Sequence, residues 1–163
     1  VKTFAQGPIC HNGLIFEGQV AGRSGYFFLE YGHSGYLDVF TGKQKLGLQI
    51  TPAAQRLKGT AVVARRVHGD LTQLSQVVEQ VRNMPYAFSL RALLRLLYRT
   101  NTQFAEHFWC SDFIARVLVA IGCLRWDHAA FNAQPTDFSS TAMSNQLHYT
   151  CTVEPDRLWD SRR

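Results

Sequence analysis

The stretch FWCSDFIARVLVAIG, residues 108–122, decides the fold that this sequence predicts. From Phe113 to Ile121 its apolar residues recur at helical spacing, which predicts a helix that begins at Cys110. The plainly polar residues of this helix are few: Ser111, Asp112 and Arg116. A helix with so little polar surface is expected at the centre of the fold. Gly122 follows it, and glycine is a common helix stop.

Upstream of this helix, short apolar runs separated by glycines predict an antiparallel sheet. Their aromatic and β-branched residues favour strands, and the glycines between them suit turns that need a positive φ. The runs are residues 14–16, 26–29, 36–40 and 61–67. The front half of the chain is therefore expected to be rich in β-structure.

Two further helices are predicted between the sheet and the central helix. Over residues 71–81 the apolar residues repeat with helical spacing, and Asp70 with Gln73 resembles a capping pair. A second helix is expected from about Ser89 to Arg99. One of its faces is leucine-rich and another carries a basic stripe formed by Arg91, Arg95 and Arg99. The stripe suits a solvated helix face or a surface that docks on anionic lipid or a protein partner.

The composition fits one ordinary globular domain spanning residues 1–163. Of its 163 residues, 46% are hydrophobic and 18% are charged. The net charge of +5 fits a surface with excess lysine and arginine, or contact with an anionic partner; a nucleic acid partner is not expected. We recognise no signal peptide and no apolar run of the roughly 20 residues that a membrane span needs.

The four cysteines are scattered and form no CxxC pair, which argues against a zinc ribbon and against a dense disulfide framework. They are Cys10, Cys110, Cys123 and Cys151. Free thiols in a reducing intracellular compartment are the simplest interpretation. We expect no metal site, because no second ligand pair completes the one that Cys10 and His11 would begin.

Cys110 is the candidate nucleophile, because it opens the central helix. A helix N-terminus carries about half a positive charge, which stabilises a thiolate there. The free N–H groups of the first helical turn are also placed to bind the oxyanion of an acyl intermediate. The alternative is a small buried residue between aromatic neighbours.

A thiolate catalyst also needs a proton acceptor, and His11 is the candidate. It lies at the start of the first predicted strand, and a strand is a rigid mount for an imidazole. Glu30 ends the second apolar run. If the two runs form a hairpin, Glu30 is expected beside His11 as the group that orients the imidazole. The alternatives are a surface histidine and a solvated strand-end carboxylate.

In their order along the chain, four short segments resemble the permuted branch of the NlpC family of papain-like cysteine hydrolases. This branch includes bacterial YiiX-like proteins and a small poxvirus protein. The matching segments are residues 11–14 (HNGL), 28–30 (FLE), 85–89 (PYAFS) and 108–113 (FWCSDF). As in that branch, the nucleophile helix follows the strands, whereas in papain it precedes them. The resemblance covers roughly residues 3–124, which leaves residues 125–163 as an irregular C-terminal extension.

The resemblance implies a fold and roles for residues. It implies an α+β fold of the circularly permuted papain-like type, with a small antiparallel sheet or half-barrel packed on the central helix. Cys110 is then the nucleophile, His11 the general base and Glu30 the orienting carboxylate. Residues expected to bind substrate are Tyr86, Trp109 and Ser111. One departure from the family pattern is Asn12, which replaces an apolar residue and puts a polar group on a core face.

The function expected is that of a thiol hydrolase or acyltransferase acting on an amide, ester or thioester, without a cofactor. The acyl substrate is a small molecule, peptide or lipid. Two alternatives stay open. One is a catalytically silent binding or structural component with the same fold. The other is a lipid-directed acyltransferase that resembles the lecithin:retinol acyltransferase relatives of this fold.

Overall fold

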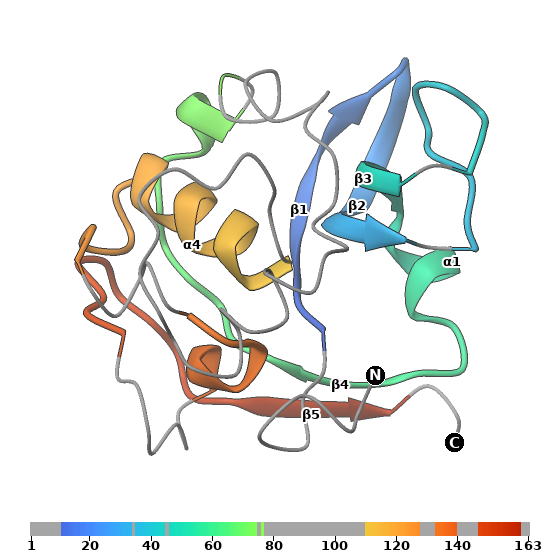
Figure 1. The fold of residues 1–163 in the computed structure, drawn as a ribbon. Coiled ribbons are helices and arrows are strands. Elements are labelled where there is room, and N and C mark those ends of the chain that lie inside the picture. Colours follow the sequence, from blue (N-terminus) through green and yellow to red (C-terminus); the bar gives the residue numbers. More distant parts are fainter. Residues whose placement is uncertain are drawn as a thin grey trace, which may run out of the picture.

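The computed structural model describes residues 11–33, 35–44, 46–74, 76, 110–127, 133–139 and 147–160. The fold is mixed α+β, with small antiparallel sheets and few helices among these residues (Figure 1). The strands are β1 (Gly13–Val20), β2 (Arg23–His33), β3 (Leu46–Pro52), β4 (Ala61–Ala64) and β5 (Arg157–Asp160). The helices are α1 (Ala53–Leu57), η1 (Leu71–Gln73), α4 (Cys110–Ala120) and η2 (Pro135–Phe138).

The larger sheet is an antiparallel meander in the order β1-β2-β3. A tight turn joins β1 to β2 through Ala21 and Gly22, which both have positive φ values. The register places Gly13 opposite Glu30, and Glu30 opposite Gln49. Because directly opposed residues point to the same face of a sheet, this row of three lies on one face. It begins two residues after His11.

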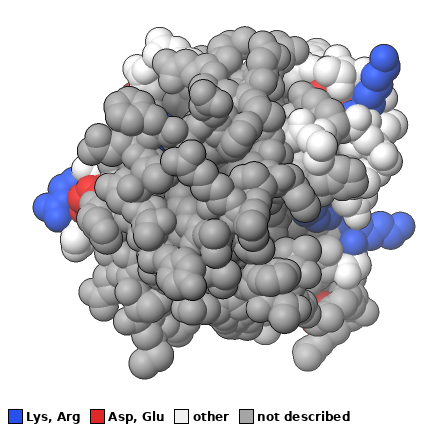
Figure 2. All heavy atoms as spheres, viewed as in Figure 1, with Lys and Arg blue, Asp and Glu red and all other residues white. Residues whose placement is uncertain are grey.

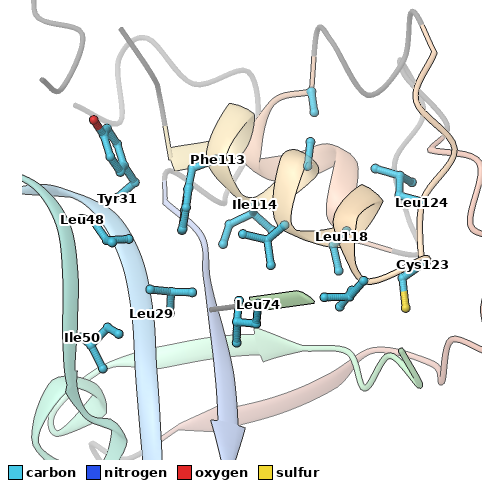
Figure 3. Close-up of a cluster of buried hydrophobic side chains, with 14 of the residues drawn as sticks. Leu29, Tyr31, Leu48, Ile50, Leu74, Phe113, Ile114, Leu118, Cys123 and Leu124 are labelled. Carbon is cyan, nitrogen blue, oxygen red and sulfur yellow. The ribbon is translucent and has the colours of Figure 1, made fainter. Parts of the chain in front are cut away.

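The two faces of this sheet bury different helices (Figure 1). On one face α4 packs against β1 and β2, and the main hydrophobic core lies between them. Figure 3 shows side chains from the sheet, such as Leu29, meeting Phe113 and Ile114 of α4. On the other face α1 packs against β2 and β3, where Phe28 contacts Ala53 and Leu57.

The predicted central helix is confirmed, with Cys110 as its first residue. It ends at Ala120, one residue before the predicted end, and Gly122 follows with φ 71°. The helix is buried beyond its apolar residues, since its polar residues Ser111 and Asp112 are buried as well. No helix among the described residues is long and apolar enough to cross a membrane.

The strand predicted over residues 36–40 is wrong. These residues form a loop organised by the buried carboxylate of Asp38. That carboxylate accepts hydrogen bonds from the backbone N–H and the hydroxyl of Thr41 and from the backbone N–H of Ile50. The third strand of the sheet is instead β3, which the sequence analysis did not predict.

The second sheet pairs β4 with β5 and so joins two segments almost a hundred residues apart. Isolated bridges link Val67 to Val153 and Leu124 to Tyr149. The expectation that residues 125–163 are irregular is therefore corrected, because η2 and β5 lie in this segment. The predicted strand 61–67 is confirmed only as far as Ala64.

The helix predicted over residues 71–81 is described only at its start. Residues 71–73 form the short helix η1, and the carboxylate of Asp70 caps it by accepting a hydrogen bond from the N–H of Thr72. The predicted helix from Ser89 to Arg99 lies outside the described residues.

We predict that Gly13→Ala destabilises the fold by about 1–3 kcal/mol, the usual range for overpacking. A Cβ at Gly13 would collide with the Phe28 ring and lie 2.8 Å from the carbonyl oxygen of Leu29. Gly18→Ala in the same strand is the matched control, because a Cβ there meets Phe16 at an ordinary 3.6 Å. Urea unfolding of both variants measures the difference, and equal midpoints would show that the Gly13 contact is unimportant.

Candidate active site

Cys110 lies at the N-terminus of α4, where the positive end of the helix dipole stabilises negative charge on its sulfur. Its helix has 11 residues, and its burial in the core fixes the direction of its axis. Cys110 itself is only 4% exposed. The thiol is therefore held rigidly in a mostly dry environment, in which electrostatic contacts are strong.

His11 and Glu30 are in direct contact. The Nε2 atom of His11 lies 2.7 Å from the Oε2 atom of Glu30. The β1–β2 register explains the contact, because Glu30 pairs with Gly13, two residues after His11. The imidazole is half-buried, with 30% of the side chain exposed, while the Glu30 side chain is 2% exposed.

The Cys110 thiol is the second group that acts on the same imidazole, and it is near enough to raise the pKa of His11. The Nε2 atom of the ring faces Glu30. The imidazole thus lies between a thiol and a carboxylate, an arrangement that serves nucleophilic catalysis in unrelated folds.

The surroundings of His11 favour its charged form. Burial acts against a charged imidazole, but the hydrogen bonds and the charge attraction from Cys110 and Glu30 outweigh it. Together they raise the pKa of His11 from 6.5 to about 10. At neutral pH the ring is therefore an imidazolium, which can stabilise a thiolate on the sulfur that it contacts.

Arg56 is the residue that the sequence analysis missed. From α1 its Nε atom donates to Oε1 of Glu30 at 2.7 Å, and its Nη2 atom donates to Oε2 at 2.9 Å. Its guanidinium carbon lies 5.2 Å from the centre of the Phe28 ring and 5.5 Å from that of Tyr36. The sequence carries no local signal for this role, because Arg56 stands in no recognisable motif.

Glu30 is ionised despite its burial. Burial alone would raise the pKa of this carboxyl group, but the hydrogen bonds from His11 and Arg56, with their positive charges, lower it below its usual value. A buried carboxylate without such partners would take up a proton. His11 and Arg56 therefore act together to keep Glu30 negative.

The other predicted site residues are less fully placed. Ser111 follows Cys110 in α4 and is 1% exposed, so its role in binding substrate stays a prediction. Tyr86, Trp109 and the basic stripe (Arg91, Arg95 and Arg99) lie outside the described residues. The amide atoms of Asn12 are buried and have no hydrogen-bond partner among the described residues, although the residue as a whole is only half-buried.

No group of three or more possible metal ligands occurs among the described histidine, cysteine and acidic residues. Comparisons with protein family models, with curated proteins and with solved structures found no match for this chain. The chemistry of the site is therefore inferred from its own geometry.

We predict that the wild-type protein loses stability as the pH rises from about 6.5 towards about 10. Because the pKa of His11 is raised in the folded state, its contribution is fully present below pH 6.5 and is lost as the pH rises through the folded value. Urea unfolding at a series of pH values, compared between wild type and His11→Gln, measures this contribution. Parallel curves for the two proteins would contradict it.

Proposed function

We propose that this protein is a thiol hydrolase or acyltransferase in which Cys110 is the nucleophile, His11 the general base and acid, and Glu30 the group that orients His11. The observation that carries this proposal is an imidazole that contacts the Glu30 carboxylate at 2.7 Å and is also acted on by the Cys110 thiol. A buried structural cysteine needs no such partner, because it behaves as a small apolar residue.

The proposed reaction begins from a resting pair of a Cys110 thiolate and a His11 imidazolium, in which the thiol proton already lies on the imidazole. The thiolate attacks the carbonyl carbon of an amide, ester or thioester, and a tetrahedral oxyanion forms. The backbone N–H of Cys110, at the N-terminus of α4, is the candidate donor to this oxyanion.

The intermediate then collapses, and the bond between the acyl carbon and the leaving group breaks. The imidazolium donates its proton to the leaving group, and a thioester remains on Cys110. In the second half of the reaction His11 takes a proton from water or another nucleophile, which attacks the thioester. The acyl group leaves and the thiolate–imidazolium pair is regenerated, so no cofactor is required.

We further propose that the fold is of the circularly permuted papain-like type. The order of the elements supports this, because His11 directly precedes β1 and Glu30 lies in β2, while the nucleophile helix comes later in the chain. The packing of α4 on β1 and β2 also supports it, since this brings the helix N-terminus to the histidine.

A binding surface for an anionic membrane or protein partner on the stripe of Arg91, Arg95 and Arg99 stays a separate proposal. In the view of Figure 2, the visible described lysines and arginines lie around the margin and do not gather into one patch. The described residues visible on that face therefore add no second basic surface to the proposal.

We predict that Cys110 reacts with iodoacetamide well below pH 8.5 and faster than Cys123 and Cys151. An ordinary thiol, with a pKa of about 8.5, is only about 1% thiolate at pH 6.5. His11→Gln should therefore lower the labelling rate of Cys110 at pH 6.5 by up to about 100-fold. Mass spectrometry of the tryptic peptides measures each cysteine separately.

Cys151 serves as the internal control in the same samples, because it is a described free cysteine that is partly exposed. Its labelling should not change in His11→Gln. If Cys110 labels no faster than an ordinary thiol at pH 6.5 in the wild type, the catalytic proposal fails and a binding or structural role is favoured.

A further inference from the structure

We propose that Arg56 is a positioning residue for this site: it clamps the Glu30 carboxylate so that His11 stays paired with Cys110 in mildly acidic solution. The inference rests on the proposed function, because it assigns Arg56 a part in the same thiol chemistry. In this role Arg56 influences the Cys110 sulfur only through Glu30.

The contacts of Glu30 leave little freedom to its carboxylate. Arg56 binds both oxygens through two parallel N–H groups, at 2.7 and 2.9 Å. One of these oxygens, Oε2, also contacts Nε2 of His11. Such a two-point arginine contact fixes the plane of a carboxylate as well as its position. The direction in which Glu30 holds the imidazole is therefore set by Arg56.

Arg56 is itself held in place before it meets Glu30. It lies on α1, and its guanidinium group contacts the rings of Phe28 and Tyr36. Phe28 belongs to the same face of the sheet as Glu30 and packs against Gly13 and α1. Aromatic contacts on a planar guanidinium restrict its motion, so the clamp loses little entropy when it forms.

The charged groups that act on Glu30 come from two of the elements around it. His11, just before β1, and Arg56, on α1, both favour its ionised form. On β3 the residue opposite Glu30 is the uncharged Gln49. On α4, Cys110 acts on His11.

The effect of Arg56 on His11 is indirect. Arg56 acts on His11 through the Glu30 carboxylate, whose two oxygens it holds. Without Arg56, the buried Glu30 would keep only one partner and would become protonated in mild acid. A neutral Glu30 no longer favours the imidazolium, and the thiolate on Cys110 loses its counter-charge.

The test is the pH profile of Cys110 labelling by iodoacetamide in wild type, Arg56→Lys and Arg56→Gln. An adjacent arginine typically lowers the pKa of a carboxyl group by about 1–3 units. We therefore expect the acid midpoint of labelling to move up by about one pH unit or more in Arg56→Gln. Arg56→Lys keeps the charge but not the two-point contact, so its midpoint should lie between the other two.

Arg65→Gln is the matched control. Arg65 is also half-buried, forms an ion pair with Asp156 at 3.2 Å and stacks on the Tyr149 ring at 5.2 Å. Its other hydrogen bonds go to the backbone oxygens of Glu154 and Phe138. Arg65→Gln should leave the acid midpoint of Cys110 labelling unchanged, although the substitution removes a comparable set of contacts.

The inference is overturned if Arg56→Gln, folded as judged by circular dichroism, gives the wild-type profile. If Arg56→Gln does not fold, Arg56→Lys decides, and a wild-type profile in that variant overturns the inference. Failure of the proposed function looks different. In that case Cys110 of the wild type itself labels with the pH dependence of an ordinary thiol, before any substitution of Arg56.

Discussion

A single buried carboxylate organises this site. Glu30 is nearly inaccessible to water, yet it is ionised because His11 and Arg56 share its two oxygens. Removing one partner of a buried ion pair costs far more stability than removing one partner of a surface pair. The remaining buried charge is left without solvent or a counter-charge. The three side chains therefore behave as one unit, and the unit determines where the imidazole points.

The fold brings that unit to the sulfur by two independent means. The hairpin of β1 and β2 fixes His11 relative to Glu30 through its backbone register. The apolar face of α4, packed on the other side of the same hairpin, fixes the N-terminus of the helix and with it Cys110. Core packing thus sets the geometry of the site, and substitutions in the core are expected to affect the chemistry as well as the stability.

The sequence predicted the parts that depend on local pattern. The apolar run after Cys110 was sufficient to place α4, and alternating apolar and glycine segments were sufficient to indicate the first hairpin. It also suggested Glu30 as a neighbour of His11, on the condition that the two runs pair, and the register meets that condition.

What the sequence did not predict depends on contacts between distant residues. Asp38 turns an apolar, strand-like segment into a loop because its carboxylate is satisfied by Thr41 and Ile50. Strand β5 exists because β4, far upstream, supplies its partner. Arg56 has no local pattern that marks it as part of a site, and its role emerges only when α1 folds against Glu30.

The measurement that tests this account most directly is an NMR titration of the His11 imidazole, with its ring nitrogens labelled with nitrogen-15. The account predicts that the ring stays protonated through pH 8 and titrates near 10 in the wild type. It also predicts that the midpoint falls when Cys110 is replaced by alanine. A ring that titrates near 6.5 in both proteins would contradict the account, because the imidazole would then be paired with neither the sulfur nor the carboxylate.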